Sequence, residues 1–591
     1  MENAVHATST APSDVDYQRV VYPYRRSADQ EAHERGQPAR HPVVVVGAGP
    51  VGLTAAIDLA LQGVPVVLLN NDGRLSVGSR ALCFAKRTLE ILDRLGCGQR
   101  LVDKGVSWNV GRVFFRNEQV YQFNLLAEDG HQRPAFVNLQ QYYVEGFLVE
   151  RALELPLIDL RWHHGVTGLT QHDDHVALEI ETPDGPYTLL ADHVVACDGS
   201  RSTLRKLIGE ESHGRTFKDR FLIADVRMNA PFPAERWFWF DPPFHPGQSV
   251  LLHRQPDDVW RIDFQLGWEA DPELEKQPER ILPRVRTLMR EASIAAGGDG
   301  AVPEIELVWA SVYTFACMRM DRFRHGRIVF AGDAAHGVSP FGARGANSGI
   351  QDADNLAWKL AAVVQGRAPD ALLDTYARER EMAADENILN STRSTDFITP
   401  KSEVSRMFRD ATLTLAKDFD FARRLVNSGR LSVPTLQYGM PAVDAPIRVS
   451  VGEDGDGDGD DWLLRQMQPG RFTLMVFDEA GEGSGRQRAS VGPEWGLGVQ
   501  EGSPMPRGEP ALGDAESGID VPLMLRIDDV FDARGLVRQR YDATPGSVVL
   551  LRPDQHVCAR WRTMPTGDAI HAAMRQALGH EASLEEPAAC L

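Results

Sequence analysis

The sequence predicts an α/β fold: a Rossmann-type domain, a β-rich part interleaved with it, and a second α/β unit near the C-terminus. Three observations carry this prediction. From Pro42 onward, β-rich runs alternate with amphipathic helical runs, as in α/β domains. A glycine-rich turn joins an apolar strand to a helix close to the start of this region. After a change in composition, FTLMVF (472–477) and SVVLLRPD (547–554) form two further apolar strands.

Length and composition exclude several classes of protein. The chain has 591 residues, which implies two to four domains at about 150 residues each. The 63 Lys and Arg against 83 Asp and Glu give a net charge of −20, so neither nucleic acid nor an anionic membrane is expected as a partner. The six cysteines are scattered without a CxxC pair, which favours a cytoplasmic protein without a disulfide framework or a metal site.

The start of the chain is expected to be a flexible arm over residues 1–40. This segment is rich in Ser, Asp, Arg and His and lacks the apolar region of a secretory signal. The apolar stretch 42–69 contains Asp58 and Gln62 and is interrupted by glycine and proline. We therefore expect a strand, a turn, a helix and a second strand here instead of a membrane span.

The glycine-rich turn lies in VVVVGAGPVGLTAAIDLALQG (43–63). In a GxGxxG turn, Gly47 permits the tight bend, Gly49 lets a pyrophosphate approach the backbone, and Gly52 lets the helix pack closely on the strand. The helix N-terminus then offers unpaired N–H groups and the positive end of its dipole to the phosphates. The segment predicts a dinucleotide-binding unit.

The end of the next strand departs from the usual pattern. A Rossmann unit places Asp or Glu there to bind the ribose hydroxyls. This chain has Asn70, followed by Asn71 and Asp72. Either Asn70 contacts the ribose without a charge, or Asp72 takes over that contact.

Two later segments also join strands to helices through polar turns. In HVVACDGSRSTLRKLIG (193–209), a strand ends at Asp198 and a helix follows that carries Arg205. In GRIVFAGDAAHGVSPFGARGANSGIQDADNLAWKLAA (326–362), a strand ends at Gly332 and Asp333, and a glycine-rich loop leads into a long helix. An Asp at a strand end can accept ribitol hydroxyls, and the glycines bring backbone N–H groups up to an anionic ring or phosphate.

In their order and spacing, these three segments resemble the flavoprotein aromatic hydroxylases, single-component FAD monooxygenases that include p-hydroxybenzoate, phenol and 3-(3-hydroxyphenyl)propionate hydroxylases. The resemblance implies an α/β FAD-binding domain (Rossmann-type, p-hydroxybenzoate hydroxylase-like) interleaved with a β-rich substrate domain. The later strands, with the segment 541–546 between them, resemble the thioredoxin-like C-terminal domain of the phenol hydroxylase branch, here without redox cysteines. The implied boundaries are 41–395 for the FAD-binding and substrate domains (substrate part roughly 105–135 and 212–318), 396–440 for a helical connector and 441–591 for the thioredoxin-like domain.

The resemblance also implies which residues bind FAD. They are Gly47, Gly49 and Gly52 at the pyrophosphate, Asn70 near the adenosine ribose, Arg80 at phosphate or ribose, Gln141 at the flavin chain, Asp198 and Arg205 in a motif tied to FAD and NAD(P)H, Gly332 and Asp333 at the ribitol, and Pro340, Gly342, Gly345 and Asn347 beside the isoalloxazine ring.

The implied activity is hydroxylation of a small phenolic or aromatic-acid substrate. NADH or NADPH would reduce FAD, dioxygen would form a C4a-hydroperoxyflavin, and its distal oxygen would be transferred to the ring. The protein would exclude water, place Pro340 beside the flavin and help to ionise the phenol. The family also leads us to expect a homodimer.

Candidate substrate residues lie on the strand VWRIDFQLG (259–267), whose alternation places Arg261, Asp263 and Gln265 on one face. Arg261 can bind a carboxylate or a phenolate, and Asp263 can orient or deprotonate a phenol. The alternative is a polar stripe that faces solvent. His253 and Tyr313 are further candidates.

Other functions remain open from the sequence. The run 237–242 (WFWFDP) resembles the WxWxIP signature of flavin-dependent halogenases, with Asp in place of Ile. Another FAD oxidoreductase of the same fold is a related possibility, and a non-catalytic flavin- or aromatic-binding protein is a third. The acidic run 452–461 lacks the glutamate that a calcium loop needs, so we expect a surface loop there.

Overall fold

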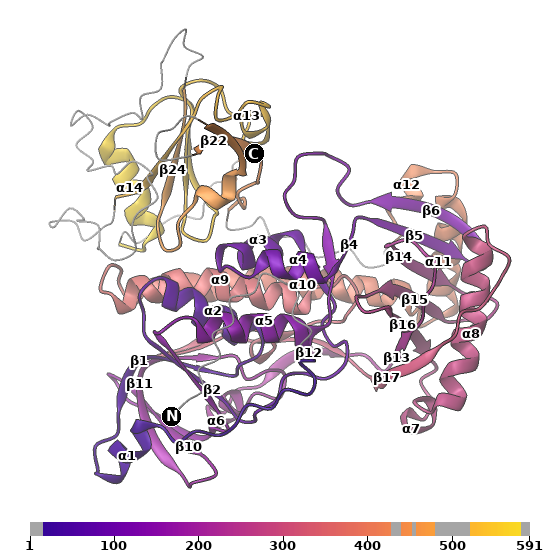
Figure 1. Ribbon diagram of the computed structural model, residues 1–591, viewed down its shortest axis with the longest axis horizontal. Helices are drawn as coiled ribbons and strands as arrows, with labels where there is room; N and C mark the ends of the chain where they lie inside the picture. The colour runs from indigo at the N-terminus through magenta and orange to yellow at the C-terminus, as the bar shows by residue number, and fades with distance from the viewer. Residues whose placement is uncertain (1–15, 427–438, 452–456, 479–520, 581–591) are drawn as a thin grey trace.

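The computed structural model describes residues 16–426, 439–451, 457–478 and 521–580 (Figure 1). The first 15 residues of the predicted arm, part of the predicted connector and parts of the C-terminal unit lie outside these ranges. In the part of the chain that the structure describes, none of the helices combines the length and the apolar character that a membrane span requires.

The central sheet has a parallel core, as the alternation of strands and helices predicts. Its main strands lie in the order β19 (Arg324–His325), β20 (Ile328–Phe330), β11 (Tyr187–Ala196), β1 (Arg40–Val46), β2 (Val66–Asn70) and β8 (Ile158–Trp162), and β10 (Val176–Glu181) and β9 (Gly165–Gln171) extend it beyond β11. The valines 43–46 of β1 are buried because strands pair with β1 on both sides and its two faces are covered.

Helices pack in layers beside this sheet. Helix α2 (Pro50–Leu61) follows β1 and contacts both α5 (Gln141–Leu153) and α9 (Gly345–Val364), and α10 (Leu372–Ile398) packs along α9 (Figure 1). Shorter helices complete this part of the chain: α3 (Lys86–Arg94), α4 (Gly98–Lys104) and α6 (Thr203–Leu207). Two small sheets join it to the next domain: β3 (Cys83–Ala85), β7 (Phe136–Asn138) and β4 (Val106–Trp108), and β12 (Ser212–Thr216), β18 (Ala316–Met320) and β21 (His336–Gly337).

A seven-stranded sheet combines segments that are far apart in the sequence. Its order is β17 (Glu306–Tyr313), β13 (Arg220–Arg227), β16 (Val259–Leu266), β15 (Ser249–Arg254), β14 (Arg236–Phe240), β5 (Val110–Phe115) and β6 (Glu118–Asn124). One face packs on α8 (Pro278–Ala295), which follows α7 (Pro272–Glu275). The other face contributes to the cavity described below, so this sheet places side chains opposite the dinucleotide-binding unit.

The prediction of a flexible arm is wrong for residues 16–40. Tyr17 is buried and its ring packs edge-on against Tyr143 and Phe147 of α5, while the ring of Tyr22 stacks on Trp162 with centroids 4.4 Å apart. Helix α1 (Ala28–Glu34) follows and contacts β11. The polar composition of the segment hides these aromatic anchors, whose partners lie more than a hundred residues further along the chain.

The C-terminal unit lies beyond α3 and α9, away from the seven-stranded sheet (Figure 1). Helices α11 (Glu403–Ala416) and α12 (Asp420–Arg423) precede it. Its sheet has the order β25 (Leu523–Ile527), β24 (Thr473–Phe477), β26 (Val548–Leu551) and β27 (Val557–Trp561), and α13 (Leu536–Arg540) and α14 (Gly567–Ala577) complete it. The unit buries Leu474, Val548 and Met574 against Trp358 of α9 and Leu372 of α10, so the two parts share a core.

The expectation of a surface loop over the acidic run 452–461 is wrong for residues 457–461, and residues 452–456 lie outside the described ranges. Strand β23 (Gly457–Trp462) pairs antiparallel with β22 (Pro446–Val451) over six residue pairs. Backbone hydrogen bonds to β22 hold a segment whose composition disfavours strands, because pairing with an existing strand outweighs the weak intrinsic propensity of Gly and Asp.

Candidate active site

A first cavity of about 280 Å³ lies at the carboxyl ends of β1, β2 and β11, where open α/β sheets bind ligands. It is lined by residues of the glycine-rich turn, of the end of β2 and of the start of α6: Val46, Gly47, Gly49, Leu69, Asn70, Asn71, His164, Val166, Cys197, Asp198, Gly199 and Thr203. The first and second sequence motifs therefore meet at one site.

The three glycines of the turn have different roles. Gly47 has φ +105°, and a Cβ there would lie 2.4 Å from the carbonyl oxygen of Cys197. A Cβ on Gly52 would lie 1.9 Å from the carbonyl oxygen of Gly47, so both positions exclude a side chain on packing grounds. A Cβ on Gly49, by contrast, would meet none of the described residues within 4 Å apart from its chain neighbours and its own helix, and its φ of −80° suits any residue. The space at Gly49, at the N-terminus of α2, is thus left free by the protein for a ligand.

This contrast gives a prediction with an internal control. Gly49→Ala should fold normally but weaken FAD binding about 10- to 100-fold, because the new methyl group occupies ligand space. Gly52→Ala should instead destabilise the apoprotein by roughly 1–3 kcal/mol, because the methyl group collides with the backbone. Urea unfolding without FAD and titration with FAD separate the two effects. Wild-type FAD affinity in Gly49→Ala would show that no ligand approaches there.

The side chain of Asn70 stabilises the turn itself. Its Oδ1 accepts a hydrogen bond from the backbone N–H of Ala48 at 3.0 Å, and its Nδ2 donates to Asp72 at 3.1 Å. Asn70 lines the first cavity, whereas Asp72 is exposed and is not among the lining residues. Of the two alternatives that the sequence leaves open, this arrangement favours Asn70 as the residue beside the ribose.

The Asp198 motif is held together at the start of α6. Asp198 Oδ2 accepts hydrogen bonds from the N–H groups of Thr203 and Leu204, while its buried Oδ1 has no partner. Arg205 donates to the carbonyl oxygens of Ala334 and Ser200, both at 2.7 Å. Arg205 lines neither cavity, so its side chain joins the second motif to the third, and direct contact with a cofactor stays a prediction.

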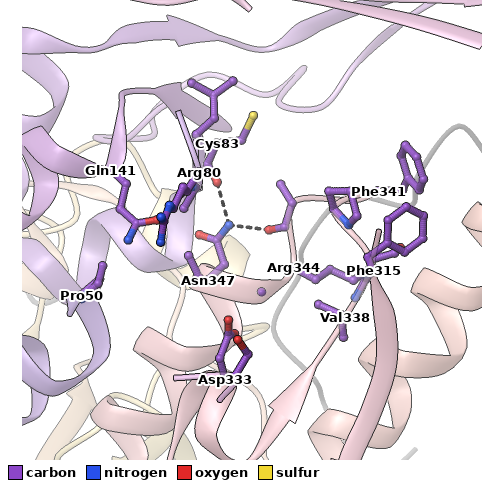
Figure 2. Close-up of a pocket in the computed structure, with 18 of the residues that line it drawn as sticks. Pro50, Arg80, Cys83, Gln141, Phe315, Asp333, Val338, Phe341, Arg344 and Asn347 are labelled. Carbon is purple, nitrogen blue, oxygen red and sulfur yellow. Dashed lines mark hydrogen bonds between the residues drawn. The ribbon is translucent and has the colours of Figure 1, made fainter. Parts of the chain in front are cut away.

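A second, larger cavity of about 540 Å³ lies between the dinucleotide-binding unit and the seven-stranded sheet (Figure 2). Gly49, Cys197 and Gly199 line both cavities, so the two form a continuous site. Of the predicted residues, Arg80, Gln141, Asp333, Pro340, Gly345, Asn347, Arg261 and Asp263 line the larger cavity.

Asp333 enters this cavity from the end of β20 (Figure 2). Its side chain is exposed to the cavity, and among the described residues nothing donates a hydrogen bond to the carboxylate. Burial within the protein raises the pKa of Asp333. An enclosed carboxylate without donors is suited to accept hydroxyl hydrogen bonds from a ligand, as the ribitol of FAD would supply.

A buried ionic cluster behind Asp333 fixes this strand end. Asp352 of α9 accepts hydrogen bonds from the N–H of Gly332 at 2.9 Å and from Nε2 of His336 at 2.6 Å. Nε of Arg380 donates to the same carboxylate at 2.6 Å. These two neighbours lower the pKa of Asp352 despite its burial, so it stays ionised. The hydrogen bond from His336 to Asp352 thus helps to hold this strand end in place.

Asn347 anchors the glycine-rich loop that precedes α9 (Figure 2). Its Nδ2 donates to the carbonyl oxygens of Cys83 and Ala343, at 2.8 and 2.5 Å, and its Oδ1 accepts from the N–H of Ala85 and from Thr88. Because all these partners belong to the protein, any contact of Asn347 with the flavin falls to its backbone. Gly342, with φ +101°, makes the bend that brings this loop to the cavity.

Arg80 and Gln141 also line this cavity, on the side away from Phe315 and Phe341 (Figure 2). Gln141 accepts a hydrogen bond from the N–H of Ala81 at 3.0 Å and donates to Glu145 at 2.7 Å. The loop before Arg80 is fixed by the seven-stranded sheet, because Asp225 accepts from the N–H and Oγ of Ser79. The exposed Arg80 side chain is thus held at the junction of the two domains.

The substrate face is a polar row across the sheet. Arg236 of β14 pairs with His253 of β15, which pairs with Arg261 of β16, which pairs with Asp225 of β13. All four side chains are buried, so the alternative of a solvent-facing stripe is wrong for Arg261 and Asp263. Strand alternation identified this face correctly, but the facing domain covers it.

Within this row, Arg261 and Asp263 form an ion pair. Arg261 Nη2 lies 2.9 Å from Asp263 Oδ1, and His253 Nε2 lies 3.3 Å from Asp263 Oδ2. Arg261 and His253 lower the pKa of Asp263 to about 2, although burial alone would raise it. Burial lowers the pKa of His253 to about 4, so at neutral pH the imidazole is neutral beside an ionised carboxylate.

Sequence reasoning missed Arg236, which also lines the cavity. It lies in the run RWFWF, where the aromatic residues draw attention to a halogenase-like signature. Trp237 and Trp239 point to the other face and pack into the core beneath α8, so they do not line the described cavities. The alternation of that run, arginine and phenylalanine against two tryptophans, was the signal that could have placed Arg236 on the cavity face.

The geometry thus defines a dinucleotide-binding flavoprotein. The space in front of Gly49 and the unpartnered Asp333 fit the pyrophosphate and the ribitol of FAD, and the larger cavity adjoins both. No group of His, Cys, Asp and Glu suited to a metal ion occurs among the described residues.

Comparisons with known proteins agree with this class. Residues 40–391 match the family model described as an FAD binding domain. A flavin-dependent monooxygenase of Mycobacteroides abscessus is 33% identical over 57% of this chain and 70% of the relative. A probable NADH-specific resorcinol 4-hydroxylase of Rhodococcus jostii is 29% identical over 87% of this chain and 91% of the relative. The structure of the flavin-dependent monooxygenase PieE in complex with FAD and substrate superimposes on this chain with a TM-score of 0.70 at 21% sequence identity. The match covers 92% of this chain and 99% of the PieE chain.

The chain belongs to this FAD-binding family and is a flavin-dependent monooxygenase. The resemblance drawn from the three sequence motifs is thereby confirmed, as are the FAD-binding fold and the enzymatic class.

Proposed function

We propose that this protein hydroxylates a small phenolic compound with NADH, FAD and dioxygen. One observation carries the proposal: Asp333 and the loop before α9, on the FAD side, share a single cavity with the polar row of the seven-stranded sheet. About 540 Å³ is the volume of a site for one drug-sized ligand, and the flavin ring must occupy part of it, so the substrate is small. The likeness to the resorcinol hydroxylase supports both the phenolic substrate and NADH.

The protein's own contribution is to orient the phenol, to accept its proton and to exclude water. FAD, when bound and reduced, supplies the chemistry that activates dioxygen. Phe315, Phe341 and Leu251 form an apolar part of the cavity wall and keep water away from the reacting atoms.

His253 is the best placed proton acceptor. Its Nε2 faces the ionised Asp263, which holds Nε2 protonated, and its buried Nδ1 has no partner in the structure. Because burial lowers the pKa of His253 to about 4, the imidazole is neutral at pH 7, and the lone pair on Nδ1 can accept a hydrogen bond from the phenol hydroxyl and draw off its proton as the hydroxyl becomes acidic during reaction. Asp263, which Arg261 and His253 hold ionised, serves to orient His253.

The test is NADH consumption by the FAD-loaded protein with a panel of phenols and phenolic acids, with the products analysed by mass. We expect at least one phenol to stimulate consumption and to gain one oxygen atom. His253→Asn should lower the rate at neutral pH about 10²- to 10⁴-fold, the usual contribution of a general base, and leave FAD content unchanged. Bound FAD with no stimulation by any phenol, or phenol binding without turnover, would contradict the proposal.

We also propose that the C-terminal unit is thioredoxin-like and structural, that the enzyme is a homodimer and that it is cytoplasmic. The mixed sheet around β24, with Cys558 as the one cysteine among the unit's described residues, supports the first. The exposed apolar residues Val404, Met407, Phe408 and Leu415 along α11 support the second. The described cysteines, all free thiols, support the third. Light scattering of wild type and Phe408→Asp tests the dimer.

A further inference from the structure

We propose that Arg236 forms an anion-binding subsite that takes a carboxylate carried by the substrate, so that the preferred substrate is a phenolic acid. This inference rests on the proposed function, because it concerns the substrate end of the same cavity. It assigns the role of specificity to a residue of β14, apart from the Arg261–Asp263 pair.

Arg236 is a buried cation for which the described residues provide no ion pair within 4 Å. Only 3% of the residue is exposed, it lines the larger cavity, and its Nε and Nη1 have no hydrogen-bond partner among the described residues. Its Cζ lies 4.8 Å from the centroid of the Phe238 ring, and Asp263 attracts it only from beyond ion-pair distance. A buried guanidinium without a directly bonded counter-ion is unfavourable, and burial lowers the pKa of Arg236 accordingly.

Two of the other three arginines that line the cavity are already engaged. Arg261 pairs with Asp263 and donates to the carbonyl oxygens of Ser79 and Arg80. Arg344 donates to Asn387 at 2.6 Å. Arg80 is exposed, and the sequence predicts that it binds FAD. The positive charge that remains available at the substrate end of the cavity is therefore that of Arg236, and a carboxylate is the group that would satisfy its donors.

The position of Arg236 beside His253 favours a carboxylate over a phenolate as the bound anion. The two residues are direct cross-strand partners, so their side chains start about 5 Å apart on the same face. If His253 takes the phenol proton, the hydroxyl group lies at His253 and the group at Arg236 is a second one. A phenolic acid supplies both groups, one to each strand.

The experiment compares an acid with its uncharged amide. 3-Hydroxybenzoate and 3-hydroxybenzamide, and 3-(3-hydroxyphenyl)propionate and its amide, are titrated into the FAD-loaded enzyme, with the change in flavin absorbance as the readout. We expect wild type to bind the better acid about 10- to 100-fold more tightly than its amide. In Arg236→Gln this preference should disappear, with amide affinity within about 3-fold of wild type.

Arg254→Gln is the matched control, because Arg254 lies on the same sheet but on the face toward Trp260, outside the cavity. It should retain the preference for the acid. Equal affinity of wild type for acid and amide would overturn the proposal, and this comparison decides the matter even if Arg236→Gln fails to fold. Equal losses for acid, amide and resorcinol in Arg236→Gln would also overturn it, since they would assign Arg236 to the phenol or to packing.

Failure of this inference is distinguishable from failure of the proposed function. The titrations measure binding alone, whereas the proposed function is tested by NADH consumption and product mass. An enzyme that hydroxylates resorcinol and shows no preference for acids would retain the proposed function and lose the carboxylate subsite.

Discussion

Asp352→Asn is expected to destabilise the protein by about 3–5 kcal/mol and to abolish stable FAD binding. Asp352 is fully buried and accepts hydrogen bonds from Arg380, His336 and the N–H of Gly332. The amide removes the buried carboxylate that pairs with the charge of Arg380 and loosens the strand end that presents Asp333. Urea unfolding of the apoprotein and the FAD content of the purified variant measure the two effects.

Because Asp352 is ionised in the folded protein, we expect the free energy of unfolding to depend on pH. Since the pKa of Asp352 is lower in the folded than in the unfolded chain, its stabilisation is present above the ordinary carboxyl pKa and is lost as the pH falls through the folded value. Asp374→Ala is the control, because Asp374 forms an exposed ion pair with Arg324 and should cost less than about 1 kcal/mol. Equal stability of Asp352→Asn and this control would contradict the role given to the cluster.

Arg552→Ala is expected to cost a similar 3–5 kcal/mol and to weaken the attachment of the C-terminal unit. Arg552 donates to Glu379 of α10 at 2.9 Å and to Asp554 at 2.6 Å, and Arg552 and Asp554 are buried while the Glu379 side chain is 14% exposed, where this unit meets α9 and α10. Its removal leaves two buried carboxylates without their common cation. Limited proteolysis should then separate the C-terminal unit from the FAD-binding domain faster than in wild type.

The control for this variant is Arg526→Ala in the same unit. Arg526 bonds to Asp478 at a half-exposed position, so its loss should change stability by less than about 1 kcal/mol. If Arg552→Ala were digested at the wild-type rate, the ionic contacts would not hold the unit in place, and the apolar core around Trp358 would be sufficient.

Local patterns predicted the dinucleotide-binding unit well. The four valines, the three glycines and the helix that follows are contiguous, and a Cβ on Gly47 or Gly52 would collide with the backbone, whereas the need for glycine at position 49 stays a prediction about FAD. The alternation of strand 259–267 likewise placed Arg261 and Asp263 on one face. These features depend on neighbours in sequence, so the sequence was enough to find them.

Features that depend on distant partners were not predictable in this way. Tyr17 looks like part of a polar tail until α5 is packed against it. Asn347 and Arg205 are residues of the kind that often bind cofactors. Here their side chains instead donate hydrogen bonds to backbone carbonyl oxygens in other segments of the chain. That Arg236 faces the cavity with two unpartnered nitrogen atoms follows only from the alignment of the strands and from the packing around them.

Turnover under ¹⁸O₂, with NADH and the phenol that best stimulates its consumption, shows directly whether oxygen from dioxygen reaches the substrate. We expect a product that carries one ¹⁸O atom on its ring, formed as NADH is consumed, with little hydrogen peroxide because the cavity excludes water. A product without the label, or consumption that ends entirely in hydrogen peroxide, would contradict the assignment of this protein as an aromatic hydroxylase.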